Sequence, residues 1–313
     1  MLGQRLLSAL IIISCSLGFV ALDALVPIAG CQGLWMTVLA IYLMLGSAVE
    51  CSVMLKHRPE GFEALPALLG CGGIMLAATI PMLWPLSGEA YPQDCPLGPL
   101  GWPLAAAMIA LVGNFVWYIP KYVPSTNVLS RATLGSWLSV YFGIGFAFWV
   151  ALRQTQAPLH DSAQPPSVGT WGLTLVVGLI VVTKFTDAGA YFSGRAFGKH
   201  KLCPAVSPGK TVEGLVGGMI VGVVVSFLYF RLFTVWLYGD NWTNRDWIGP
   251  VLLGVTLTLA GLAGDLLESI VKRETQFKDS SRFLPGLGGL WDVTDSLLPA
   301  GVVGYLIVAA DLL

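Results

Sequence analysis

Ionisable side chains gather in one stretch, from Ser269 to Ser296, that lies between two long apolar segments. Charged groups at a membrane boundary are costly, so they need partners or a function. Two turn-forming pairs, Pro285-Gly286 and Gly288-Gly289, separate a mostly basic half from an acidic half. Cations beside carboxylates are typical of a site that binds phosphate groups and a metal ion. The charged members of the stretch include Lys272, Arg273, Lys278, Asp279, Arg282, Asp292 and Asp295.

Two pairs of carboxylates lie at the ends of the apolar segments, and both have the i,i+3 spacing of a helix face. Asp265 and Glu268 end one expected helix, and Asp292 and Asp295 begin the next. Carboxylates that meet at such a boundary repel one another unless a cation binds between them. Oxygen ligands suit Mg²⁺, which takes one or two carboxylates plus substrate phosphates. The alternatives are an ion pair from Glu268 to Lys272 and stabilisation of the second pair by the helix dipole.

A second basic loop precedes these carboxylates. Asp187 lies late in an apolar helix, and the run Ser207-Pro208-Gly209-Lys210-Thr211 predicts a tight turn with two hydroxyls and a cation. Backbone N–H groups and lysines at such turns suit phosphate oxygens. The alternative is a positively charged loop held near anionic lipid headgroups. Together with the carboxylates, the loop favours a phosphate-and-metal site. Its other members are Gly194, Arg195, Gly198, Lys199 and Lys201.

The composition indicates a membrane protein. Charged residues are 11% of the 313 residues, against roughly 25% in soluble domains, and apolar residues are 55%. The mean hydropathy is +0.75. These values exclude an ordinary soluble protein and predict an all-α polytopic membrane protein. None of the six cysteines forms a C-x-x-C pair, which argues against a zinc site, and a disulfide between Cys31 and Cys95 stays open.

Apolar runs predict about nine transmembrane helices, each near the roughly 20 residues that a bilayer requires. With the N-terminus in the cytoplasm, 13 of the 17 lysines and arginines fall in inside segments and two, Arg153 and Arg245, in outside loops, as the positive-inside rule demands. Residues 1–168 would hold five helices and residues 169–313 the other four with two cytoplasmic loops, in one membrane domain. The expected helices cover residues 6–26, 34–55, 62–86, 102–120, 132–152, 170–191, 214–238, 248–268 and 290–312.

The residues of the last stretch keep a fixed order, namely Ser269, Lys272-Arg273, Lys278-Asp279, Pro285-Gly286, Gly288-Gly289, Asp292, Asp295 and Ser296. This order resembles the signature of the phosphatidate cytidylyltransferase family, also called CDP-diacylglycerol synthases. The resemblance begins at Asp187 and continues to the C-terminus, whereas the first half supports it only through hydrophobicity. Three positions depart from the pattern. Leu287 replaces a histidine, Val293 an arginine and Thr186 a common asparagine.

The resemblance implies an enzyme that joins CTP and phosphatidate to give CDP-diacylglycerol and pyrophosphate with Mg²⁺, and it leaves open a monovalent cation. Asp265, Asp279, Asp292 and Asp295 would then hold the metal ion, directly or through water. The catalytic set would be Lys272, Arg273, Lys278, Asp279, Asp292 and Asp295. Substrate contacts would come from Asp187, Arg195, Lys199, Ser207, Lys210, Arg282, Gly288 and Gly289. We expect Arg282 to supply a phosphate contact in place of the missing cation.

The same resemblance sets the expected partners and location. The partners would be CTP, phosphatidate or a related lipid phosphate, and membrane lipids, with no nucleic acid. The small-residue pair Gly218 and Gly222 could pack helices within the chain or in a homodimer. The protein would lie in a bacterial inner membrane with its active site on the cytoplasmic side.

Two other functions stay open. A catalytically inactive or repurposed relative would bind nucleotide or lipid without turnover, and Leu287 and Val293 favour that interpretation. A multi-pass transporter would use Asp23, Glu50, Lys184 and Asp187 as a path through the membrane. No pattern of broken half-helix repeats supports a transporter.

Overall fold

Residues 2–28, 31–59, 61–89, 91–92, 94–124, 127–156, 170–234 and 247–313 are described by the computed structural model. Within them, nine helical segments are long and apolar enough to cross a membrane, as predicted. The chain is thus a helical integral membrane protein, and its described residues also include a small hairpin.

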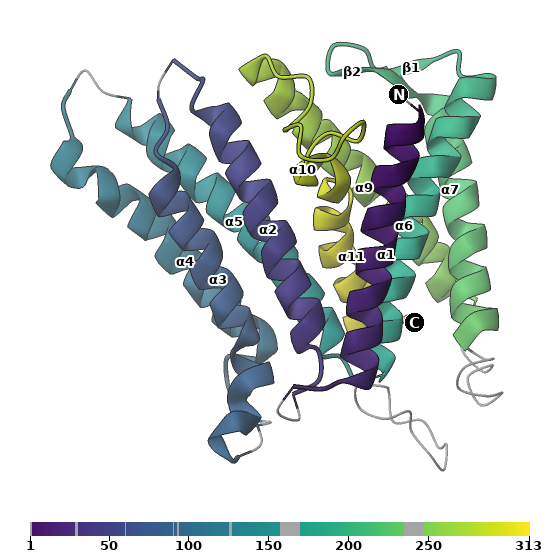
Figure 1. The fold of residues 1–313 in the computed structure, drawn as a ribbon, viewed down its shortest axis with the longest axis horizontal. Coiled ribbons are helices and arrows are strands. Elements are labelled where there is room, and N and C mark those ends of the chain that lie inside the picture. The colour runs from purple at the N-terminus through teal and green to yellow at the C-terminus, as the bar shows by residue number, and fades with distance from the viewer. Residues whose placement is uncertain are drawn as a thin grey trace. The chain divides into compact units, whose positions relative to one another are not determined.

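Figure 1 shows the order of the elements along the chain. Short segments η1 (Trp84–Ser87), η2 (Ile119–Lys121) and η3 (Leu228–Phe233) continue helices α3, α4 and α7. The helices are α1 (Leu2–Leu25), α2 (Leu34–Leu55), α3 (Ala64–Leu83), α4 (Gly98–Tyr118), α5 (Val128–Arg153), α6 (Thr170–Phe197), α7 (Val212–Phe227), α9 (Ile248–Thr275), α10 (Leu290–Thr294) and α11 (Leu297–Ala309).

Helix α9 is longer than its apolar run predicts. We expected it to end near residue 268, but it continues to Thr275. Hydropathy marks where a helix leaves the apolar layer, not where its hydrogen bonds stop. Lys272 and Arg273 are good helix formers, and cations in a last turn complement the helix dipole. The extension places Lys272 on the same helix as Asp265 and Glu268.

The last span is interrupted where we expected one continuous helix over residues 290–312. Helix α10 ends at Thr294, and α11 begins at Leu297. The cause is Pro299, because a proline inside a helix clashes with the carbonyl four residues earlier, here that of Asp295. The break therefore turns the backbone of Asp295 and Ser296 out of the helical ladder.

The chain divides into two compact units. The first comprises Met1–Gln154 with Val271–Thr294, and the second Thr155–Ile270 with Asp295–Leu313. In the first unit α3 packs on α4 and α5, and α10 packs on α2. The fully buried ring of Trp291 lies 5.3 Å from that of Phe142. Gly46 lies directly against the side chain of Leu290, so a glycine allows the close contact of α2 with α10.

A buried ion pair ties α1 to α5 in this first unit. Arg153 Nε lies 2.6 Å from Asp23 Oδ2, and the N–H of Met36 donates to Asp23 Oδ1 at 3.2 Å. Both side chains are almost completely enclosed, with 4% and 0% exposed. The two charges therefore neutralise each other at a position that solvent hardly reaches.

Glycines bring three helices of the second unit together. A Cβ at Gly222 or Gly254 would overlap the backbone of the facing helix, so α7 and α9 approach through their main chains. Gly218 lies against Ala190 of α6 and Thr258 of α9. The expected small-residue pair thus packs within the chain, which leaves the homodimer without that support.

The basic loop after α6 forms an antiparallel hairpin of β1 (Lys201–Cys203) and β2 (Ser207–Thr211). The tight turn that we expected over residues 207–211 is wrong, since these residues form β2 and the turn lies at residues 204–206. Pro208 is tolerated because proline suits the edge of a small sheet. Thr211 ends the strand and caps α7 by accepting the Gly214 N–H at 3.1 Å.

Candidate active site

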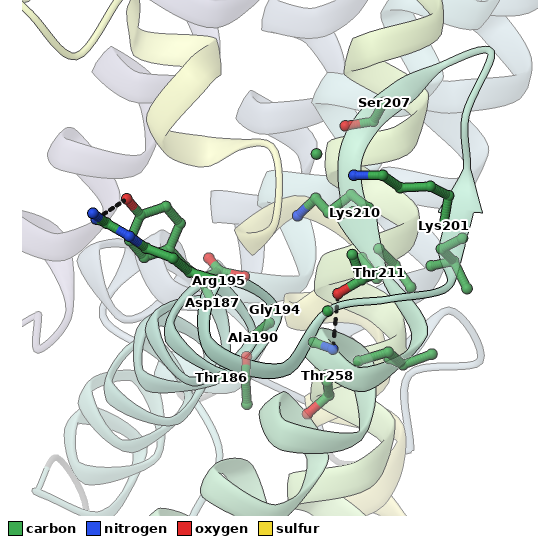
Figure 2. Close-up of a pocket in the computed structure, with 17 residues that line it drawn as sticks. Thr186, Asp187, Ala190, Gly194, Arg195, Lys201, Ser207, Lys210, Thr211 and Thr258 are labelled. Atoms are coloured by element: carbon green, nitrogen blue, oxygen red, sulfur yellow. Dashed lines mark hydrogen bonds between the residues drawn. The ribbon is translucent and has the colours of Figure 1, made fainter.

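A cavity of about 470 Å³ lies in the second unit among α6, the hairpin, α7 and α9. Three cations, Arg195, Lys201 and Lys210, line it together with Asp187 and Ser207 (Figure 2). Four of the predicted substrate residues, Asp187, Arg195, Ser207 and Lys210, are thus brought to one cavity. Lys201 is an additional cation that the predicted set omitted.

Small residues shape the inner wall of this cavity. A Cβ at Gly198 would overlap the carbonyl oxygen of Gly194, and one at Gly214 would lie 2.8 Å from that of Ala190. Glycine is therefore needed where α6 and α7 meet below the hairpin. Lys199, another predicted substrate residue, is absent from the lining. Its backbone N–H donates to Glu213 at 3.0 Å and so helps to fix the hairpin.

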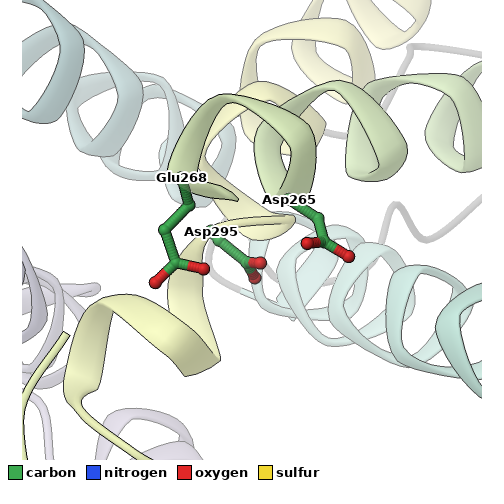
Figure 3. Close-up of side chains that lie close together, drawn as sticks. All are labelled: Asp265, Glu268 and Asp295. Carbon is green, nitrogen blue, oxygen red and sulfur yellow. The ribbon is translucent and has the colours of Figure 1, made fainter. Parts of the chain in front are cut away.

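Three carboxylates converge in the same unit. Asp265 and Glu268 come from α9 and Asp295 from the break before α11, and one oxygen of each lies within 4.8 Å of the others (Figure 3). A Cβ at Gly264 would overlap the carbonyl oxygen of Asp295, so this glycine lets α9 reach the break. Asp265 and Asp295 were predicted metal ligands, and Glu268 joins them because its i,i+3 spacing puts it on the face of Asp265.

Lys210 connects the carboxylates to the cavity. Its ammonium contacts Asp265 Oδ2 while the same side chain lines the cavity. About 30% of each side chain is exposed, so both groups are accessible to a ligand. A cation-lined cavity beside three carboxylates is an arrangement that can hold a polyphosphate together with a divalent ion.

A third polar group in this unit surrounds Ser296. Its hydroxyl lies 2.8 Å from Lys184 Nζ and 3.1 Å from Asp187 Oδ2, and the ammonium is 3.5 Å from the same carboxylate. The backbone N–H of Ser296 donates to Asp295 Oδ1 at 2.6 Å. This serine therefore links Lys184 and Asp187 to the carboxylate group.

The first unit holds the other predicted aspartate of the last span. Asp292 Oδ1 contacts the ammonium of Lys272, and Asp292 Oδ2 accepts the N–H groups of Ser280 at 2.8 Å and Gly289 at 2.7 Å. The structure thus brings Asp292 together with Lys272. Its carboxylate is satisfied by donors of the protein itself.

Glu50 of α2 contacts both ends of the same loop. It accepts hydrogen bonds from the hydroxyls of Ser280 at 2.8 Å and Ser281 at 2.7 Å. It also accepts the backbone N–H groups of Leu290 at 3.0 Å and Trp291 at 2.9 Å, the first two residues of α10. Four donors on two oxygens account for a buried carboxylate in an apolar helix.

The glycine pair of the loop lies against these carboxylates. Gly288 has φ +96°, and a Cβ there would overlap Asp292, while a Cβ at Gly289 would overlap Glu50 and Ser280. Gly288 and Gly289, predicted substrate residues, thus allow close approach of two acidic side chains. The other predicted residues of this segment, Arg273, Lys278, Asp279 and Arg282, are exposed.

Glu50, Lys184 and Lys201 lay outside the set predicted from the sequence. The first two carried a signal, because each is an ionisable residue inside an apolar run and such residues need partners. The identity of those partners depends on contacts across more than 100 residues, which spacing alone does not reveal.

Comparisons with known proteins follow the same features. A family model described as "Cytidylyltransferase family" matches residues 3–310. A phosphatidate cytidylyltransferase of Staphylococcus aureus is 31% identical over 283 residues, 89% of this chain and 92% of its own. One from Mycobacterium bovis is 27% identical over 307 residues, 97% of this chain and 89% of its own. One from Haemophilus influenzae is 45% identical over 129 residues, 41% of this chain and 43% of its own.

Proposed function

Since this chain belongs to the cytidylyltransferase family and is a nucleotidyltransferase of phospholipid biosynthesis, we propose that its second unit holds the triphosphate and the metal ion of the reaction. The reaction joins CTP and phosphatidate to give CDP-diacylglycerol and pyrophosphate. The contact between Lys210 and Asp265 carries the proposal, because it makes the cationic cavity and the carboxylate group one continuous site.

The chemistry requires positioning more than a strong base. A phosphate oxygen of phosphatidate forms a bond to the α-phosphorus of CTP, and the bond from that phosphorus to the departing pyrophosphate breaks. The second pKa of a phosphate monoester is about 6, so the attacking group is mostly ionised at neutral pH. The protein therefore has to align the two phosphates and offset their charge.

Arg195, Lys201 and Lys210 are the cations placed for the phosphates of CTP. Arg195 Nη1 lies 3.4 Å from the hydroxyl of Tyr191, another residue of the cavity wall. This bond orients the guanidinium, which remains largely exposed. A guanidinium offers paired N–H groups to phosphate oxygens, which a lysine cannot do.

Asp265, Glu268 and Asp295 fit a divalent ion, because they offer only carboxylate oxygens from a partly enclosed position. This donor set suits Mg²⁺. When bound, Mg²⁺ would neutralise developing charge on the phosphates. Asp292, which we predicted as a ligand, is held by Lys272, Ser280 and Gly289, and we assign it to organising the loop. Asp279 is exposed and stays a candidate for contact through water.

The departures from the family pattern leave the loop able to form. Leu287 donates its N–H to the carbonyl of Leu284 at 3.0 Å, and the N–H of Leu284 bonds to the carbonyl of Gly288 at 2.8 Å. Backbone bonds thus close the turn without a histidine. Arg282 is exposed on the same loop, and its contact with a phosphate, in place of the cation missing at Val293, stays a prediction. Arg282→Ala should then lower turnover strongly, and an unchanged rate would remove this role.

We place the site on the cytoplasmic side of a bacterial inner membrane. The basic hairpin that lines its cavity favours that side by the positive-inside rule, and the relatives that the chain matches are bacterial. This location gives the cavity access to CTP, while phosphatidate reaches it from the membrane.

Purified protein supplied with labelled CTP, phosphatidate and Mg²⁺ tests the function directly. We expect a CDP-lipid to form, to require Mg²⁺, and to be lost in Asp265→Asn. The matched control is Asp94→Asn, an exposed carboxylate in the loop before α4, which should keep the full rate. Wild-type protein that consumes no CTP, or Asp265→Asn that turns over normally, would overturn the proposal.

A further inference from the structure

Lys184 is an ammonium group in the interior of a membrane-spanning helix. It lies in α6, within the span Trp171–Phe197. A charge at this depth is costly and is retained where it has partners or a role. Its partners are Ser296 at 2.8 Å and Asp187 at 3.5 Å. The proposed function so far gives this lysine no task.

The position of these partners relates Lys184 to the catalytic carboxylates. Ser296, only 1% exposed, also binds Asp187 through its hydroxyl and Asp295 through its N–H. Asp187 lines the cavity, and Asp295 belongs to the group with Asp265 and Glu268. Lys184 thus lies between Asp187, which lines the cavity, and Ser296, which contacts the carboxylate group.

The local charge favours a cation beside Asp187. Four carboxylates, those of Asp187, Asp265, Glu268 and Asp295, lie in this part of the second unit. Lys210 offsets one of them through its contact with Asp265. One divalent ion among three carboxylates leaves Asp187 to be neutralised by another positive group, since nearby like charges disfavour ionisation. Lys184 reaches the site through this contact, because its ammonium is 3.5 Å from the carboxylate of Asp187, which lines the cavity.

We propose that Lys184 is a fixed cation of the active site, whose ammonium fills the place beside Asp187 and Ser296 that a monovalent ion would otherwise occupy. This inference rests on the proposed function and extends it. It assigns the enzyme one exchangeable divalent ion and one cation that is part of the chain.

Removing the ammonium should change metal binding and turnover in opposite directions. The local site becomes more negative, so a divalent ion binds more tightly; we expect the Kd for Mn²⁺ to fall by roughly threefold to tenfold. Mn²⁺ is a suitable probe because carboxylates bind it much as they bind Mg²⁺. Turnover should fall by about 10- to 100-fold, the usual cost of losing a group that orients the ligands of a metal ion.

The test uses the full-length protein in nanodiscs, with Lys184→Ala, Lys184→Arg and the control Lys121→Ala. Lys121 is a half-exposed lysine that is 2.5 Å from Glu63, so its loss also breaks a lysine–carboxylate pair. Mn²⁺ binding is measured without CTP by electron paramagnetic resonance, and turnover is measured with ammonium chloride or choline chloride at equal ionic strength. Ammonium should restore part of the turnover of Lys184→Ala, whereas choline, too large for the gap, should not. Lys184→Arg should keep more activity than Lys184→Ala, and Lys121→Ala should behave as the wild type.

The outcomes separate this inference from the proposed function. Full turnover in Lys184→Ala would contradict the role of Lys184 as a fixed cation. The role would also be contradicted if Lys184→Ala bound Mn²⁺ with unchanged affinity and ammonium did not restore its lost turnover. If Lys184→Ala does not fold, Lys184→Arg is measured instead. A wild-type Mn²⁺ Kd and turnover rate in Lys184→Arg would support a role for the positive charge, and the loss of Mn²⁺ binding and of turnover would oppose it. If the wild-type protein does not turn over CTP, the proposed function is wrong. The Mn²⁺ measurement would still show whether Lys184 affects the affinity for the metal ion.

Discussion

Glu50 and Trp291 are 241 positions apart in the chain, and the N–H of Trp291 donates to the Glu50 carboxylate at 2.9 Å. This bond fixes the start of α10 against α2. The same carboxylate holds Ser280 and Ser281, so one acidic side chain sets both ends of a loop. The exposed residues Lys278, Asp279 and Arg282 are carried on that loop, and their position therefore depends on Glu50.

Replacing Glu50 with glutamine should release this loop. The amide has one acceptor oxygen where the carboxylate has two, so its NH₂ group would face two donors. Each buried donor left unsatisfied costs about 1–3 kcal/mol. We expect faster hydrogen exchange in peptides covering residues 277–292 and turnover about tenfold lower. The control is Glu63→Gln, whose partly exposed carboxylate binds Trp117 and Lys121. Unchanged exchange and turnover in Glu50→Gln would contradict the role.

The two kinds of aspartate should separate in a metal-binding measurement. Asp265→Asn removes a carboxylate from the group of three and should weaken Mn²⁺ binding about tenfold or more, because the site loses a charged ligand. Asp292→Asn should leave Mn²⁺ binding near the wild-type value while it loosens the loop that Lys272, Ser280 and Gly289 hold. Equal losses of Mn²⁺ affinity in both variants would show that Asp292 is a ligand, as its spacing with Asp295 first suggested.

Gly264 permits the carboxylate group to form. A Cβ there would overlap the Asp295 carbonyl, so Gly264→Ala should push the break before α11 away from α9. We expect weaker Mn²⁺ binding and a loss of turnover of about tenfold or more, since small misplacements of catalytic groups are costly. Gly73→Ala is the matched control, because a Cβ at Gly73 in α3 meets no atom within 4 Å. Normal Mn²⁺ affinity in Gly264→Ala would show that α9 can shift to accommodate the Cβ without disturbing the carboxylate group.

Much of the fold was readable from the sequence, because hydropathy and length directly specify membrane-spanning helices. The nine spans were expected, and the i,i+3 spacing of Asp265 and Glu268 correctly placed them on one face. The errors came where local chemistry overrides hydropathy. Pro299 breaks the last span at Asp295, and the residues around Pro208 extend into a strand.

The site was harder to predict because its contacts are long-range. The residue types of the basic loop and the family resemblance pointed to Asp187, Arg195, Ser207 and Lys210, which share one cavity. They could not show that Lys210 reaches Asp265, or that Asp292 is held by Lys272. Glu50 and Lys184 stood out as charges in apolar helices, but only the folded chain supplies their partners.

The buried pair of Asp23 and Arg153 should matter for stability and not for chemistry. Arg153→Met leaves the Asp23 carboxylate uncompensated where no water reaches it, and breaking a buried pair in this way costs about 3–5 kcal/mol. We expect a clearly lower unfolding temperature in detergent. Lys121→Met removes one partner of a pair that is 45% and 37% exposed, which should cost at most about 1 kcal/mol. Similar unfolding temperatures for the two variants would contradict the difference in burial.

Lys210 contacts Asp265 and also lines the cavity, so a metal ion and the nucleotide should compete for its charge. In the absence of ligands its ammonium neutralises one of the three carboxylates. A divalent ion bound there would take over that task and leave Lys210 available to the phosphates of CTP.

Lys210→Ala should therefore raise the KM for CTP by about tenfold and lower the Kd for Mn²⁺ measured without CTP, since one competing cation is gone. Lys199→Ala is the control, because Lys199 lies in the same basic segment but does not line the cavity. Two separate measurements, titration of CTP in the turnover assay and Mn²⁺ binding, decide the matter. A change in the KM with an unchanged Mn²⁺ Kd would mean that the contact with Asp265 does not oppose metal binding, and that Lys210 serves the nucleotide alone.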